Sequence, residues 1–189
     1  MTSKPSKVTR DQQVKARKVG MKLAPHLREA KDKGVPLTAT QERILAKMER
    51  LDETVRIGFA KQPFMQTIGA QLASVGSGKC EILLPFDVKL TQQHGFFHGG
   101  VISTIADNAA GFAAYSLMPE GRQPLSIEFK VSLLSVATGK PLIARAEVLK
   151  AGRKIFHVRS DVLIVEEDDE VLVATALATI KCSKSVKEV

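Results

Sequence analysis

Residues 98–118 constrain the fold more than any other segment of the chain. They read HGGVISTIADNAAGFAAYSLM, with apolar residues at helical spacings, and Pro119 follows them. Small or apolar side chains lie on nearly every face of the predicted helix, so the helix must be buried. The rest of the chain therefore has to supply a large apolar surface that encloses it.

Segments with alternating apolar and polar residues can supply that surface. They predict strands over residues 79–84, 126–133, 144–148 and 156–162. Short glycine-rich or polar turns separate the segments and favour hairpins between strands that are neighbours in sequence. These turns lie at 76–78, 138–141, 151–153 and 167–170. We therefore predict an α+β fold in which an antiparallel sheet wraps around one long central helix.

The net charge of +8 lies entirely in the first third of the chain. Residues 1–62 contain 15 Lys and Arg against 7 Asp and Glu, whereas residues 63–189 contain 13 of each kind. Within the first part, residues 41–56 have an amphipathic helical pattern, and Thr38 with Gln41 offers a capping-box start. We predict a basic, largely helical N-terminal extension over residues 1–62 and a separate domain over residues 63–189.

Membrane insertion and secretion find no support in the sequence. No apolar stretch approaches the roughly 20 residues that span a bilayer, and no secretory signal pattern opens the chain. Cys80 and Cys182, the two cysteines, lie far apart in sequence, which favours a reducing compartment. We expect a cytoplasmic protein, with a mitochondrial one as the alternative because Asp11 is the single acid in residues 1–28.

The central helix carries the groups that indicate chemistry. Gly99 and Gly100 would leave backbone N–H groups uncovered at a helix N-terminus, which is the geometry of an oxyanion hole. Asp107 lies within the same helix among apolar residues, where an unpaired carboxylate would cost several kcal/mol or shift its pKa upward. An acid in that position favours a catalytic role over a purely structural one.

The segment around these residues resembles the signature of hotdog-fold acyl-CoA thioesterases of the PaaI-like family. The resemblance covers about residues 60–182 and rests on Gln92, His98, Gly99, Gly100, Asp107 and Asn108. It implies hydrolysis of an acyl-CoA to a free carboxylic acid and CoA. It also implies that no metal or redox cofactor is needed, because coenzyme A enters as part of the substrate.

The resemblance assigns a role to each matching residue. Gly99 would donate its backbone N–H to the thioester carbonyl, and Asp107 would act as general base on water or as nucleophile. Ser126 would orient the attacking water, and His98 would brace the loop or contact the substrate. Gln92 stands where many relatives have Asn, and its longer amide can still donate to the carbonyl.

Two further sets of residues are candidate substrate contacts. Gly100 and the basic pair Arg153 and Lys154 are predicted to contact CoA, because relatives often place basic residues at that rim, and an ordinary solvated turn is the competing interpretation. Four aromatic residues are candidates either for an acyl pocket or for the core. They are Phe96, Phe97, Phe112 and Tyr115.

The spacing along the central helix bears on assembly. Gly99 and Asp107 are eight residues apart, which separates them by about 12 Å along a helix axis. One thioester cannot contact both, so their joint action requires Asp107 from a second copy and a two-fold dimer with two composite sites. The resemblance implies the same homodimer, paired again into a homotetramer.

A second hypothesis is a protein that senses acyl-CoA without hydrolysing it, while its basic extension binds DNA or a partner. Nucleic-acid binding is disfavoured because the extension offers one convincing amphipathic helix, and a sensor would not require Asp107. Metal binding is disfavoured as well, because His94 and His98 have no third ligand nearby in the sequence.

Overall fold

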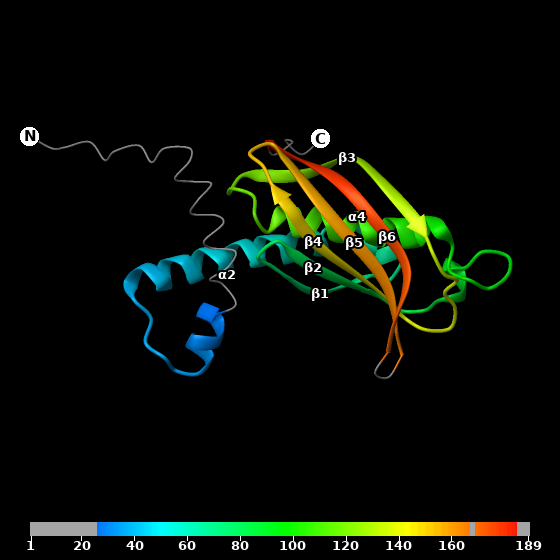
Figure 1. The fold of residues 1–189 in the computed structure, drawn as a ribbon, viewed down its shortest axis with the longest axis horizontal. Coiled ribbons are helices and arrows are strands. Elements are labelled where there is room, and N and C mark those ends of the chain that lie inside the picture. The colour runs from blue at the N-terminus through cyan, green and yellow to red at the C-terminus, as the bar shows by residue number, and fades with distance from the viewer. Residues whose placement is uncertain (1–25, 167–168, 185–189) are drawn as a thin grey trace, which may run out of the picture. The chain divides into compact units, whose positions relative to one another are not determined.

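A computed structural model describes residues 26–166 and 169–184 (Figure 1). The elements are α2 (Ala39–Ala60), α3 (Pro63–Thr67), β1 (Gln71–Gly76), β2 (Lys79–Leu84), the 3₁₀ helix η1 (Val88–Leu90), α4 (Gly99–Tyr115), β3 (Arg122–Leu133), β4 (Leu142–Ala151), β5 (Ile155–Glu166) and β6 (Asp169–Lys184). The chain divides into two compact units, Met1–Met48 and Glu49–Val189. The division falls inside α2, whereas the sequence places the domain boundary between residues 62 and 63.

The predicted capping box at the start of α2 is confirmed. The Thr38 N–H donates to Gln41 Oε1 at 2.8 Å, and the Gln41 N–H donates to Thr38 Oγ1 at 3.3 Å. The two residues thereby satisfy backbone donors that the first turn of a helix leaves without partners. In the same unit the side chains of Leu27 and of Leu45, which is on α2, are buried.

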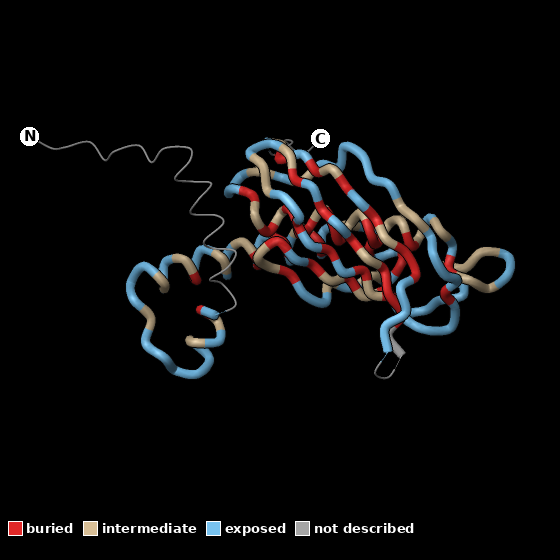
Figure 2. The backbone as a smooth tube through the Cα atoms, in the orientation of Figure 1, coloured by how far each residue is buried: buried red, intermediate tan, exposed pale blue. Residues whose placement is uncertain are grey.

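The second unit is a six-stranded antiparallel sheet that curves around α4, as the sequence predicts (Figure 1). The strand order is β1-β2-β4-β5-β6-β3, and α4 packs against all six strands. Figure 2 shows buried residues alternating with more exposed ones along the strands. Several small side chains of α4 have no exposed surface, which lets the strands approach the helix closely. They are Ala106, Ala109, Ala110, Ala113 and Ala114.

The expected hairpins between neighbouring strands are confirmed for β1 with β2, β4 with β5 and β5 with β6. The expectation is wrong at the turn over residues 138–141, because β3 pairs with β6 and not with β4. The connection after β3 instead passes the N-terminus of α4, because the Leu134 N–H donates to Val173 O and the Phe97 N–H donates to Ala137 O, both at 2.8 Å. Pro63 begins the short helix α3, at the position where the sequence places the start of the second domain.

β3 forms one edge of the sheet and exposes apolar side chains along its length. Leu125, Ile127 and Phe129 are 54%, 55% and 43% exposed. A bulge at Ile127, between Ser126 and Glu128, interrupts the pairing with β6. Long apolar edge strands are usually covered in native proteins, since they would otherwise pair with other chains.

No helix within residues 26–166 and 169–184 is both long enough and apolar enough to cross a bilayer.

Candidate active site

His98 organises the start of α4. As the N-cap residue it accepts a hydrogen bond on Nδ1 from the Gly100 N–H at 2.9 Å, and its own N–H donates to Leu90 O at 2.9 Å. Within the described residues, no acceptor pairs with the Gly99 N–H. The two glycines therefore differ: Gly100 has its N–H engaged by His98, whereas Gly99 keeps a donor available at the positive end of the helix dipole.

Leu133, the last residue of β3, lies directly against Gly99. A Cβ atom on Gly99 would stand 2.9 Å from Leu133 Cδ1, closer than such contacts normally are. The absence of a side chain at Gly99 thus serves two purposes. It leaves the N–H uncovered, and it lets the leucine side chain approach the helix start.

Asp107 is half-buried on α4 and is paired with Ser126 of β3. The Ser126 hydroxyl donates to Asp107 Oδ1 at 2.7 Å. Burial raises the pKa of the Asp107 carboxyl above its ordinary value, and the hydrogen bond from Ser126 opposes this by stabilising the carboxylate. The result is a stronger proton acceptor than a surface aspartate, held in a fixed orientation.

Asn108, the residue after Asp107, connects this turn of α4 to another part of the structure. Asn108 Nδ2 donates to Gln62 Oε1 at 2.9 Å, which ties α4 to the junction between α2 and α3. Asn108 Oδ1 is buried and has no hydrogen-bond partner in the described part of the chain. The Asn108 side chain therefore anchors the helix but leaves one polar atom unsatisfied.

Gln92 is held within its own loop. Its Oε1 accepts a hydrogen bond from the His94 N–H, and its N–H donates to Phe96 O at 2.8 Å. The structure places Gln92 in the loop that precedes His98, without a hydrogen bond to either Asp107 or Ser126.

Two of the aromatic candidates for an acyl pocket are core residues instead. Phe97 is 4% exposed and packs edge-on against Phe86, with ring centroids 5.3 Å apart. Phe112 is 5% exposed and packs in the same manner against Phe59, at 5.6 Å. A large aromatic side chain in an apolar segment of the sequence indicates burial, which a core position and a ligand pocket produce alike.

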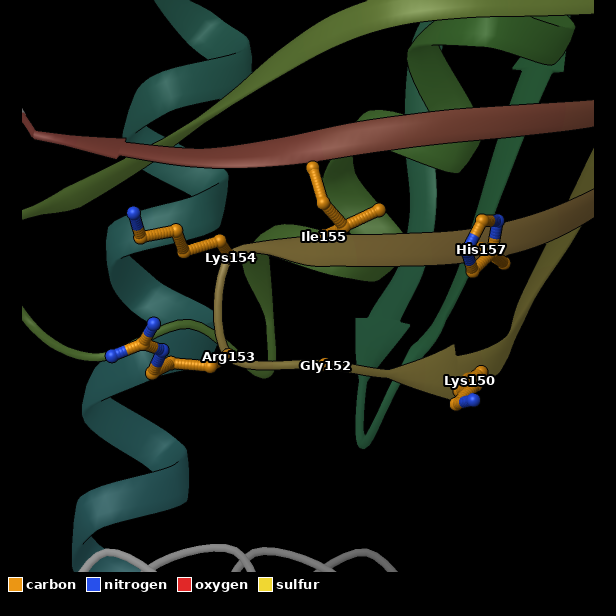
Figure 3. Close-up of a pocket in the computed structure, with 6 residues that line it drawn as sticks. All are labelled: Lys150, Gly152, Arg153, Lys154, Ile155 and His157. Carbon is orange, nitrogen blue, oxygen red and sulfur yellow. The ribbon is translucent and has the colours of Figure 1, made fainter.

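Arg153 and Lys154 line a pocket of about 300 Å³ at the turn between β4 and β5 (Figure 3). Lys150 and His157, which the sequence analysis did not single out, line it as well. These two residues oppose each other in the β4–β5 register, so the alternation of the two strands was the signal that could have found them. The pocket thus gathers three cations and a histidine around one turn.

Gly152 makes the tight turn of this pocket possible. Its N–H donates to Ile155 O at 2.9 Å, and a Cβ atom on Gly152 would stand 2.4 Å from that oxygen. No side chain fits into this space without a movement of the backbone, so the glycine is required by a close approach.

Metal ligands do not gather in the described part of the chain. Within residues 26–166 and 169–184, no three His, Cys, Asp or Glu side chains come close enough together to hold an ion. The first 25 residues of the basic extension, for which DNA binding is the alternative hypothesis, lie outside the described residues.

Comparisons with known proteins agree with this arrangement of a sheet around a buried helix. Residues 94–172 match the model of the thioesterase superfamily. The crystal structure of a thioesterase family protein from Silicibacter pomeroyi is 40% identical, with a TM-score of 0.69, and the alignment covers 71% of this chain and 99% of that one. The chain therefore belongs to the thioesterase superfamily and has the hotdog fold.

Two curated relatives are more distant. A 1,4-dihydroxy-2-naphthoyl-CoA hydrolase from Listeria monocytogenes is 25% identical over 124 residues, which cover 65% of this chain and 97% of that protein. A putative esterase from Halobacterium salinarum is 31% identical over 93 residues. That match spans 47% of this chain and 61% of the Halobacterium protein.

Proposed function

We propose that the protein hydrolyses an acyl-CoA thioester to a free carboxylic acid and CoA. The observation that carries the proposal is the hydrogen-bonded pair of Asp107 on α4 and Ser126 on β3, together with the Gly99 N–H that is available at the N-terminus of α4. Membership of the thioesterase superfamily supports the reaction class. The Listeria relative, named as the hydrolase of an aromatic acyl-CoA, supports CoA thioesters as the substrate class.

The reaction follows from these groups. The hydrogen bond from Ser126 occupies Asp107 Oδ1, and Oδ2 accepts a proton from water. The oxygen of that water bonds to the thioester carbon, and the Gly99 N–H stabilises the negative charge that develops on the carbonyl oxygen. The C–S bond then breaks, and the CoA thiolate takes the proton from the Asp107 carboxylic acid. One water is consumed, and one acid and one thiol are released.

The active unit in this proposal is a homodimer. Gly99 and Asp107 are eight residues apart on α4, which puts them about 12 Å apart along its axis, so each site combines Gly99 of one protomer with Asp107 of the other. The free apolar edge of β3 supports self-pairing, because Ile127 and Phe129 would be covered when two copies join edge to edge. We propose that two such dimers form the tetramer.

The cationic pocket is the proposed anchor for the nucleotide end of CoA. Three side chains present positive charge to the phosphate groups: Lys150, Arg153 and Lys154. The planar guanidinium of Arg153 can donate two parallel hydrogen bonds to one phosphate group. The pocket also lies at the same end of the sheet as the Asp107–Ser126 pair, because Ser126 is aligned through Ile180 with Phe156, just after the turn. Lys150 and His157 are exposed on the outer face of the sheet, whereas Asp107 lies on the enclosed helix, so a CoA bound here would extend around this end of the sheet to bring its thioester to Asp107.

Thiol release from a panel of short, medium, long and aryl acyl-CoAs tests the function. The parent protein is compared with Asp107→Asn and Asp107→Ala, with folding checked by circular dichroism and assembly by sedimentation. We expect both variants to lose about 10²–10⁴-fold in kcat, the usual contribution of a general base. If the parent releases no thiol from any substrate, or if the variants match the parent while remaining folded, the proposed function is wrong.

A further inference from the structure

Leu133 occupies an unusual position for a large apolar residue. It is 56% exposed, although it ends a strand of the sheet that encloses the core. Its register partner is Ala174, which is completely buried, so the Leu133 side chain points to the inner face of the sheet, toward α4. Its contact with Gly99 confirms this direction. An inward-facing leucine with half of its surface uncovered leaves the start of α4 open to the space outside this protomer.

This open space adjoins the donor that the proposed reaction uses. Leu133 Cδ1 lies 2.9 Å from the position that a Cβ atom on Gly99 would take, and the Gly99 nitrogen is bonded to the same Cα atom as that Cβ would be. A thioester whose carbonyl oxygen accepts from this N–H brings its carbonyl carbon, and the groups bonded to it, within van der Waals reach of the leucine. Those groups are the acyl chain on one side and the sulfur of CoA on the other.

The positions of the cationic turn and of Leu133 along β3 indicate whether the acyl chain or the CoA sulfur faces Leu133. The cationic turn lies at the end of β3 that contains Arg122 and Pro124, since the Cys182 N–H donates to Lys154 O at 2.7 Å and Cys182 is paired with Pro124. Leu133 lies at the opposite end of the same strand (Figure 1). CoA therefore approaches a composite site from the side of the protomer that provides Asp107, and the acyl group extends toward the protomer that provides Gly99 and Leu133.

We propose that Leu133 contacts the acyl group and determines which acyl groups the site accepts. This assignment rests on the proposed thioesterase function. It identifies an apolar acyl group as the ligand of this surface, because the side chain offers hydrocarbon and no hydrogen-bonding group. Shortening the side chain makes room for bulkier acyl groups, and enlarging it excludes them.

The test compares kcat/KM for a series of acyl-CoAs that differ only in the acyl group: acetyl, hexanoyl, a branched acyl and benzoyl. Leu133→Ala should raise the preference for the bulky groups over acetyl by about tenfold, and Leu133→Phe should lower it by a similar factor. Leu177→Ala is the matched control, because Leu177 is a leucine of 58% exposure whose register partners, Lys130 and Arg159, are exposed residues on the outer face of the sheet.

The outcomes distinguish failure of the role assigned to Leu133 from failure of the proposed thioesterase function. An unchanged order of preference in both Leu133 variants, or an equal loss for every acyl group with the dimer intact, overturns the role of Leu133 and leaves the thioesterase function standing. The same change of preference in Leu177→Ala overturns it too, because the effect would then not depend on the inner face. Absence of turnover in the parent overturns the proposed function and this assignment together.

Discussion

Replacement of Ser126 by alanine distinguishes two roles for this residue. The sequence predicts that its hydroxyl orients the attacking water, but the structure shows that hydroxyl donating to Asp107 itself at 2.7 Å. This hydrogen bond favours the carboxylate and so lowers the pKa of Asp107 against the larger, raising effect of burial. In Ser126→Ala only the raising effect remains, so the pKa moves further upward. Because the carboxylate is the active form, the acid limb of the rate profile moves to higher pH.

The size of the effect follows from the kind of hydrogen bond that is lost. A hydrogen bond to a charged group contributes about 1.5–3 kcal/mol, and each 1.36 kcal/mol corresponds to a factor of ten. Ser126 is exposed, so water replaces part of the lost interaction, and the low end of the range applies. We expect kcat/KM to fall about tenfold at pH values below the limb, and the parent and variant rates to converge above it.

The assay is the pH dependence of kcat/KM for thiol release, which reports the ionisation of the free enzyme. Ser126→Thr retains the hydroxyl and should restore the parent profile. Ser132→Ala is the control for loss of a hydroxyl from the same strand, because Ser132 is paired with Thr175, which lies on the face of β6 opposite to Ile180, the partner of Ser126. If Ser126→Ala lowers the rate equally at every pH and leaves the limb in place, the hydroxyl acts on the water and this reasoning is refuted.

Three further outcomes test other parts of the structure. Phe129→Lys places a charge on the free edge of β3 and should convert the dimer to a monomer in sedimentation, with loss of turnover. An unchanged dimer would show that the protomers associate through another surface. Arg153→Ala should raise KM for acyl-CoA but not for the matching acyl-pantetheine, which lacks the nucleotide, and equal effects on both would remove the pocket from CoA binding. Ser160→Ala should raise the free energy of unfolding in urea by about 1 kcal/mol, because the Ser160 hydroxyl is fully buried without a hydrogen-bond partner among the described residues. A loss of stability would show that the hydroxyl has a partner.

Periodicity in the sequence predicted the elements that depend on local pattern. The central helix over residues 98–118 appears as α4, although it ends at Tyr115 and not at Pro119. The segment 79–84 is β2 with the predicted bounds, and the Thr38 capping box forms as expected. These features are determined by residues within a few positions of one another, so the chain itself contains the information that specifies them.

The motif around α4 likewise indicated the reaction class before the fold was known. Gly99 and Asp107 are eight residues apart on one helix, and that spacing alone excludes their joint action within one protomer. The particular partner of Asp107 was beyond the same reasoning. Ser126 is 19 residues away, and its side chain meets the carboxylate only because β3 crosses the helix at that turn.

The tertiary structure decided everything that depends on pairing at a distance. It placed β3 beside β6 and not beside β4, which created the free apolar edge and brought Leu133 to Gly99. It also joined Lys150 and His157 to the basic turn. Local sequence fixes which face of a strand is apolar, but several strand orders bury that face equally well. The choice among them is made by the packing of the whole sheet around one helix, which no local segment contains.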